Sequence, residues 1–145
     1  MRVTQHFLST VYIIKGNKVL MTWNKKMEDW IPLGGHIDEN ELPCDSVIRE
    51  AKEESGLDIE LVDSWDTSKS KNLVQPLHLH LDHVADDHKH IDLVYVARVI
   101  GGEKLDQSDE GTALKWFSKQ EIERMELIPN VKEMALRALE LCKNL

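Results

Sequence analysis

Residues 34–57 read GGHIDENELPCDSVIREAKEESGL, and this stretch decides more about the fold than any other. Its first two residues are glycines, which permit a tight turn. Its second half, from Leu42 to Ser55, has the pattern of a helix, and Gly56 suits the left-handed position that often follows a helix. The stretch therefore predicts a turn, a helix and a second turn in close succession.

The predicted helix carries an acidic stripe. Glu50, Glu53 and Glu54 fall on one face when each residue advances the helix by about 100°. Like charges in such a stripe repel one another, whereas a divalent cation would attract all of them, because Mg²⁺ and Mn²⁺ prefer oxygen ligands. Arg49 lies four residues before Glu53, where its forked guanidinium could orient a glutamate. A solvated acidic face is the other interpretation of the stripe by itself.

The spacing of the whole segment matches a known signature, the Nudix box. The fixed positions are all filled, by Gly35, Glu41, Arg49-Glu50-Ala51, Glu53-Glu54 and Gly56-Leu57. The sequence therefore resembles the Nudix hydrolase family. The resemblance implies an α/β (α+β) fold, an α/β/α sandwich with a mixed sheet. It also implies a single domain over residues 3–143, with the box at residues 35–57.

The resemblance further implies an activity, which is hydrolysis of a nucleoside diphosphate linked to another moiety X by attack of water at phosphorus. The cofactor would be Mg²⁺ or Mn²⁺. Its ligands would be Glu50, Glu53, Glu54 and a backbone carbonyl of Gly35 or its neighbour Gly34. Glu53 could instead be the base that deprotonates water. Arg49 would hold a carboxylate in place.

Three further roles follow from the same resemblance. Glu41 would support the box through metal-bound water or through a salt bridge, and Gly56 would end the helix. In several members a glutamate before a late Trp-containing strand is the base or a further ligand. Glu110, six residues before Trp116, is the candidate here, and Asp109 is the neighbouring alternative.

The other elements are expected from hydrophobic pattern and turn residues. Leu42 precedes Pro43, so the box helix lacks a hydroxyl N-cap. The last helix opens at Pro129, and a short helix follows the capping box of Ser118 and Glu121. Strands are expected at Phe7–Ile14, Val19–Trp23, Trp30–Leu33, Leu57–Val62, Ile91–Ile100 and Ala113–Phe117. Residues 63–72 are expected to form a loop or a strand edge, and the alternation at Leu77, Leu79 and Leu81 is compatible with a further strand.

Residues outside the box should set the substrate. Trp23 and Trp30 flank a polar segment where a nucleobase could stack, with Lys25 and Lys26 beside them to meet phosphate; core packing is the alternative for either tryptophan. The stretch from residue 77 to 90 contains five histidines. His80 among them could bind phosphate or base, and a transition-metal site or an exposed loop are the other interpretations.

Composition limits the partners. The net charge of −8 argues against a broad nucleic-acid surface, because such binding depends on neutralising phosphates, and so no duplex partner is expected. A small nucleotide held through a divalent cation remains compatible with it. Two isolated cysteines, Cys44 and Cys142, and the lack of a long apolar run predict a cytoplasmic protein away from membranes. The oligomeric state is left open, a homodimer included.

Two rival functions remain. A binding module of this fold could sense a nucleotide or ADP-ribose without turnover, but the intact glutamates argue against it. A relative of the isoprenoid diphosphate isomerases is disfavoured, since their additional catalytic groups find no match here.

Overall fold

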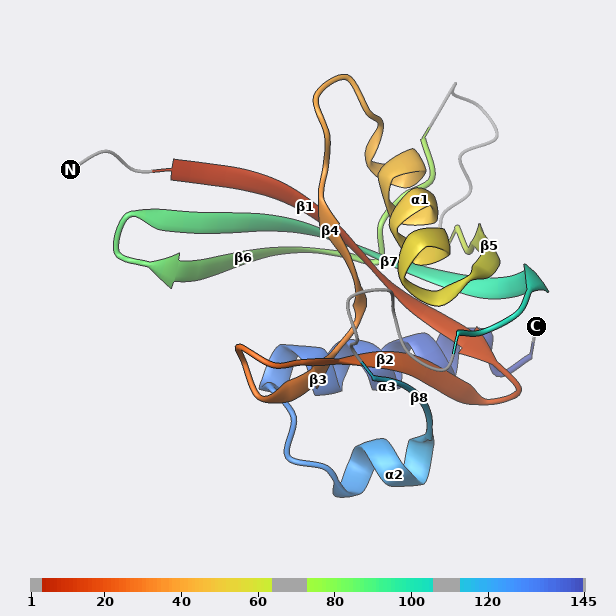
Figure 1. Cartoon of the computed structure of the whole chain (residues 1–145). Coiled ribbons are helices and arrows are strands. Elements are labelled where there is room, and N and C mark those ends of the chain that lie inside the picture. Colours follow the sequence, from red (N-terminus) through yellow and green to blue (C-terminus); the bar gives the residue numbers. More distant parts are fainter. Residues whose placement is uncertain (1–3, 64–72, 106–112, 145) are drawn as a thin grey trace.

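The computed structural model describes residues 4–63, 73–105 and 113–144. Within them, eight strands form one mixed sheet and three helices lie on its two faces (Figure 1). The strands are β1 (Thr4–Lys15), β2 (Lys18–Asn24), β3 (Asp29–Ile31), β4 (Leu33–His36), β5 (Leu57–Leu61), β6 (His78–Ala85), β7 (His88–Gly102) and β8 (Leu114–Ser118). The helices are α1 (Pro43–Ser55), α2 (Lys119–Arg124) and α3 (Pro129–Cys142). The expected α/β sandwich with a mixed sheet is confirmed.

The sheet is organised around β1. Its main path runs β3-β2-β1-β7-β5, while β4 pairs with β1, β6 with β7 and β8 with β2. The pairing of β1 with β7 is parallel and the other pairings are antiparallel. β1 therefore lies between β4, which contains the start of the box, and the long central strand β7.

Alternating side chains of β1 pack into two hydrophobic cores, one on each face of the sheet. Val11 and Ile13 are buried in the core beneath α1, whereas Tyr12 and Ile14 are buried in the core beneath α3. Successive residues of a strand point to opposite faces, so an unbroken apolar run is what a sheet covered on both faces requires. Figure 1 shows α1 and α3 on opposite sides of the sheet.

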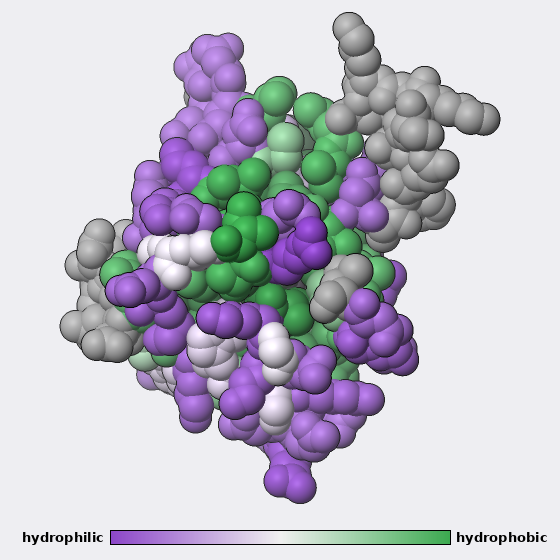
Figure 2. All heavy atoms as spheres, turned by 90° about the vertical axis from the view of Figure 1, so that its right-hand side faces the viewer, coloured by the Kyte–Doolittle hydropathy of each residue, from purple (hydrophilic) through white to green (hydrophobic). Residues whose placement is uncertain are grey.

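Figure 2 shows the face on the right-hand side of Figure 1, where hydrophobic residues gather near the middle with hydrophilic residues around and among them. No helix in the described part of the chain combines the length and the apolar character needed to cross a membrane.

The box helix begins and ends as its residues predict. Leu42 occupies the N-cap without a side-chain hydrogen bond, and Pro43 opens α1. At the other end Gly56 has a φ of 78°, and its N–H donates to the carbonyl of Lys52. A Cβ on Gly56 would also lie 2.5 Å from the carbonyl oxygen of Glu103, so both conformation and close packing require glycine here.

Several elements differ from their expected bounds. The single strand expected at residues 30–33 is interrupted at Pro32, because β3 pairs with β2 while β4 pairs with β1. The strand expected at residues 91–100 begins earlier, at His88, since its first residues pair with β1 and β6. Most of the loop expected at residues 63–72 lies outside the described residues.

Candidate active site

Two glycines place the start of the box against β1. Gly34 has a φ of 146°, and a Cβ there would overlap the backbone of Ser9 on β1. A Cβ on Gly35 would lie 2.8 Å from Oε1 of Glu50. Glycine at both positions therefore lets β4 approach β1 on one side and lets the Glu50 carboxylate approach the backbone on the other.

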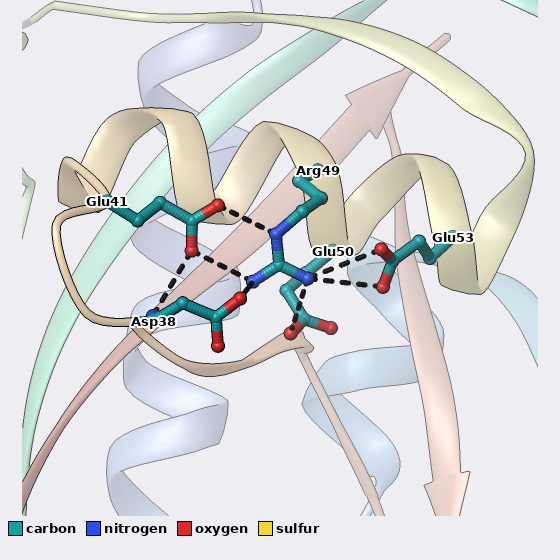
Figure 3. A network of polar contacts seen from close by, with 5 residues as sticks. All are labelled: Asp38, Glu41, Arg49, Glu50 and Glu53. Carbon is teal, nitrogen blue, oxygen red and sulfur yellow. Dashed lines mark hydrogen bonds and ion pairs between the residues drawn. The ribbon is translucent and has the colours of Figure 1, made fainter.

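Arg49 lies at the centre of a network of carboxylates from the loop and from α1 (Figure 3). Its Nε and Nη2 donate to the two carboxylate oxygens of Glu41 at 2.7 and 2.9 Å. Its Nη1 donates to Glu50 at 3.3 Å and to Glu53 at 3.2 Å. Asp38 lies 3.4 Å from Nη2. One guanidinium thus contacts four carboxylates and fixes how the loop sits on the helix.

The same contacts perturb the ionisation of both partners. The side-chain hydrogen bonds from Arg49 hold the pKa of Glu41 at about 2, well below its usual value. The hydrogen bonds to Glu41 also raise the pKa of Arg49. Glu41 therefore stays ionised through the physiological range, as a partner of Arg49 must.

The residues around Gly35 suit a hard divalent cation. Glu50 is mostly buried, with 18% of its side chain exposed, and its carboxylate lies against the Gly35 backbone. Glu53, one turn further along α1, is 58% exposed. Glu54 lies next to it on the same helix. The donors are carboxylate and backbone oxygens only, which is the ligand chemistry of Mg²⁺ or Mn²⁺.

A cavity of about 630 Å³ opens beside the two glycines, on the α3 side of the sheet. Its lining combines apolar side chains with a few polar groups, the usual make-up of a small-molecule site. The residues come from β1, β4, β6, β7 and α3 and include Thr10, Tyr12, Gly34, Gly35, His78, His80, Asp82, Asp92, Val94 and Met134.

Polar groups in this cavity include two pairs. The hydroxyl of Thr10 donates to the carboxylate of Asp92 at 3.0 Å, and Nε2 of His80 lies 2.8 Å from Oδ1 of Asp82. Burial raises the pKa of Asp92 to about 6, and the nearby charge of Asp82 adds to this, although the Thr10 hydrogen bond opposes it. The cavity thus holds a carboxyl group that gains a proton under mildly acidic conditions.

The residues expected to set the substrate are distributed unevenly. His80 lines the cavity, and of the two lysines expected to meet phosphate Lys26 lines it and Lys25 does not. Trp30 packs against Phe117 in the core beneath α3, with ring centroids 5.0 Å apart. Trp23 lies edge-on to Trp30 at 5.5 Å, and neither tryptophan lines the cavity. Glu110 and its alternative Asp109 lie outside the described residues.

Thr10, Asp92 and Asp38 were not anticipated from the sequence. Asp92 did leave a signal, since it is a charged residue inside the strongest predicted strand. Thr10 and Asp92 are 82 positions apart, and only the parallel register of β1 and β7 brings them together.

Comparison with known proteins gives consistent matches. The NUDIX domain model matches residues 6–138. A hydrolase of the NUDIX family from Clostridium perfringens is 38% identical, with a TM-score of 0.83, over 96% of this chain and 99% of that one. No curated protein sequence matches this chain.

Two more distant structures share the fold. A MutT NUDIX hydrolase from Burkholderia pseudomallei is 21% identical, with a TM-score of 0.66, over 96% of this chain and 98% of that one. An ADP-ribose pyrophosphatase from Streptococcus suis is 22% identical, with a TM-score of 0.62, over 97% of this chain and 94% of that one.

Proposed function

The chain belongs to the NUDIX hydrolase family, and on that premise we propose that it hydrolyses the phosphoric anhydride bond of a nucleotide-type substrate with Mg²⁺ or Mn²⁺. The substrate class is a nucleoside diphosphate linked to another moiety. The observation that carries the proposal is the Arg49 network, which gathers the box carboxylates beside Gly35 and next to a cavity.

The cation would be held by Glu50, Glu53, Glu54 and the Gly35 carbonyl. When bound, it would neutralise the phosphoryl oxygens and acidify a water molecule, which is what cleavage of a pyrophosphate requires. Arg49 contributes by restraining two of these carboxylates. Since Arg49 is itself anchored on Glu41 by two hydrogen bonds, Glu41 positions the site through Arg49.

The base that takes the proton of the attacking water would be Glu53 or Glu110. Of the two proposed metal ligands that Arg49 contacts, Glu53 has the greater freedom of movement, because 58% of its side chain is exposed against 18% for Glu50. For Glu110 the support is its sequence position before Trp116. Replacing Glu110 with Gln should lower the rate and change the pH–rate profile while altering metal affinity less. An unaltered profile would leave Glu53 as the base.

The substrate would lie in the cavity between β1, β7 and α3, with its pyrophosphate towards Gly35. His80 and Lys26 line this space and could contact phosphate or base. Trp23 and Lys25 would contribute only if the segment between β2 and β3 closes over the substrate. We also propose that residues 3–143 act as one catalytic domain in the cytoplasm.

The test is a panel of nucleotides, including ADP-ribose, nucleotide sugars, dinucleoside polyphosphates and oxidised deoxynucleoside triphosphates, assayed with Mg²⁺ or Mn²⁺ by mass spectrometry. Hydrolysis in ¹⁸O-labelled water would show which phosphorus is attacked. Glu53→Gln and Glu54→Gln should each reduce turnover by about 10² or more without loss of fold.

Glu123→Gln is the matched control, because Glu123 lies on α2, away from the box, and pairs only loosely with Lys119 at 3.8 Å. It should leave turnover unchanged. Tight nucleotide binding without any turnover would instead favour a sensing module. Full activity of both box variants would contradict the roles proposed for the carboxylates.

A further inference from the structure

Three strands bring four histidines to one place. His6 on β1 pairs directly with His90 on the parallel strand β7. His36 on β4 pairs with Leu8, which lies two residues from His6 and therefore on the same face. His88 lies two residues from His90, also on that face. The four imidazoles come from positions that are up to 84 residues apart in the chain, and the sheet register alone aligns them.

The rings are in close contact. One ring nitrogen each of His6, His36 and His90 lies within 4.8 Å of the other two. The ring centroids of His6 and His36 are 5.0 Å apart, and those of His36 and His90 are 5.4 Å apart. On a tetrahedral zinc ion with Zn–N bonds of about 2.1 Å, two nitrogens would be about 3.4 Å apart. Small side-chain rotations of the exposed His6 and His36 would close that difference.

Other partners do not account for this arrangement. In the described residues, no hydrogen bond or ion pair engages a ring nitrogen of His6 or His36. The Nε2 atoms of His88 and His90 are 2.8 Å apart, so His88 fixes the orientation of the His90 ring. A metal-binding histidine characteristically donates its second ring N–H to a carboxylate, a backbone carbonyl or water, and His88 would take the place of that partner here.

We propose that His6, His36 and His90 bind one divalent transition-metal ion, with Zn²⁺ as the cation of choice. Neutral imidazole is the commonest protein ligand for such ions and suits zinc, nickel and copper, whereas Mg²⁺ and Mn²⁺ prefer oxygen. The fourth position is filled by water, and His88 positions the His90 ring.

This site is distinct from the carboxylate site in ligand chemistry, yet His36 directly follows Gly35. A bound ion would join β4 to β1 and β7 at the position where the chain enters the box. Binding to the folded state only would raise the melting temperature. The ion therefore stabilises the strand that presents Gly34 and Gly35.

The test is calorimetric titration of Zn²⁺ into the full chain with excess Mg²⁺ present to occupy the carboxylates. One Zn²⁺ per chain is expected, together with a higher melting temperature. His6→Ala, His36→Ala and His90→Ala should each weaken binding by at least about tenfold. Replacing Zn²⁺ with Co²⁺ should give visible absorption bands that these variants lose. His83→Ala is the matched control, because His83 is an exposed histidine on β6 outside the cluster, and it should bind as the parent does.

Circular dichroism without metal checks that each variant folds, and Gln replaces Ala in any variant that does not. Absence of Zn²⁺ binding to the parent chain would overturn the proposal. So would equal loss of binding in His83→Ala, which indicates scattered surface histidines. Loss of binding in Glu50→Gln with retention in the three histidine variants would place the ion at the carboxylates and also overturn it.

Discussion

At the scale of single residues, Arg49 controls the box. A lysine could supply the charge but not the planar fork that bonds both oxygens of Glu41 while a third nitrogen reaches Glu50 and Glu53. The arginine therefore reduces repulsion among neighbouring carboxylates and sets their positions with one side chain. Glu41 is the residue whose ionisation reports on this contact.

Glu41 makes stability depend on pH in acid. Its pKa is about 2 in the folded chain against an ordinary value of 4.5, so its stabilising contribution is complete above the ordinary value and lost as pH falls towards 2. Glu41→Gln should therefore be less stable than the parent at neutral pH, with a difference that shrinks across this acid range. Urea unfolding at a series of pH values without added metal measures it. A difference that does not vary with pH would contradict the ion pair.

At the scale of elements, α1 is held by packing and by its C-cap more than by its N-terminus. Val47 and Ala51 are fully buried against the sheet, and Gly56 ends the helix in the left-handed conformation. Its first turn lacks a side-chain cap, although Asp45 lies there with a charge favourable to the helix dipole.

Leu42→Ser should therefore stabilise the protein by about 1 kcal/mol, because a hydroxyl at the N-cap can accept a hydrogen bond from a backbone N–H in the first turn of the helix. Leu42 is 46% exposed, so little packing is lost. Thermal unfolding measures the gain, and turnover should not change. Leu42→Ala is the matched control, since it shortens the side chain without adding a cap. An equal gain in Leu42→Ala would show that capping is not the cause.

The two glycines at the end of β4 should respond differently to alanine. In Gly35→Ala the new methyl group meets the flexible Glu50 carboxylate, so we expect reduced metal affinity and turnover with little loss of stability. In Gly34→Ala it meets the Ser9 backbone at a positive φ, so unfolding free energy should fall by more than about 2 kcal/mol.

Gly16→Ala separates the two causes, because a Cβ there meets nothing within 4 Å although φ is 55°. Its cost should be the conformational one of about 1 kcal/mol. If Gly35→Ala destabilised the chain as strongly as Gly34→Ala while keeping turnover, this would contradict the prediction that the close approach of Glu50 to Gly35 is needed for metal binding and turnover.

At the scale of the whole molecule, the sheet lies between the box helix and the cavity. The box helix covers one face, and the cavity lies on the face that α3 covers, with the glycines of β4 reaching both. Asp92 lines that cavity, and the protonation state of its carboxyl group affects the stability of the folded chain.

Asp92 should lower stability as pH rises. Its pKa is about 6 in the folded chain against an ordinary value of 3.8, so the folded state binds the proton more tightly and loses stability between these two values as pH increases. Asp92→Asn keeps an acceptor for Thr10 without the charge. The variant should gain stability relative to the parent as pH rises from about 4 to 7, measured by urea unfolding. A pH-independent difference would contradict the perturbed carboxyl.

The sequence by itself determined the features that depend on neighbouring residues. The glycine pair, the helix with its acidic face, and the left-handed end at Gly56 all lie within 24 consecutive residues, GGHIDENELPCDSVIREAKEESGL. Helical spacing and backbone sterics act over a few residues, and so the family and the box geometry could be predicted without the fold.

The tertiary structure alone decided which side chains line the cavity and which histidines form the cluster of His6, His36 and His90. Thr10 meets Asp92, and His6 meets His36 and His90, because strand register places them in the same or neighbouring rows on one face of the sheet. Trp30 packs in the core instead of lining the cavity for the same reason. Register is set by the burial of whole strands, and a shift of one residue would turn each of these side chains to the opposite face.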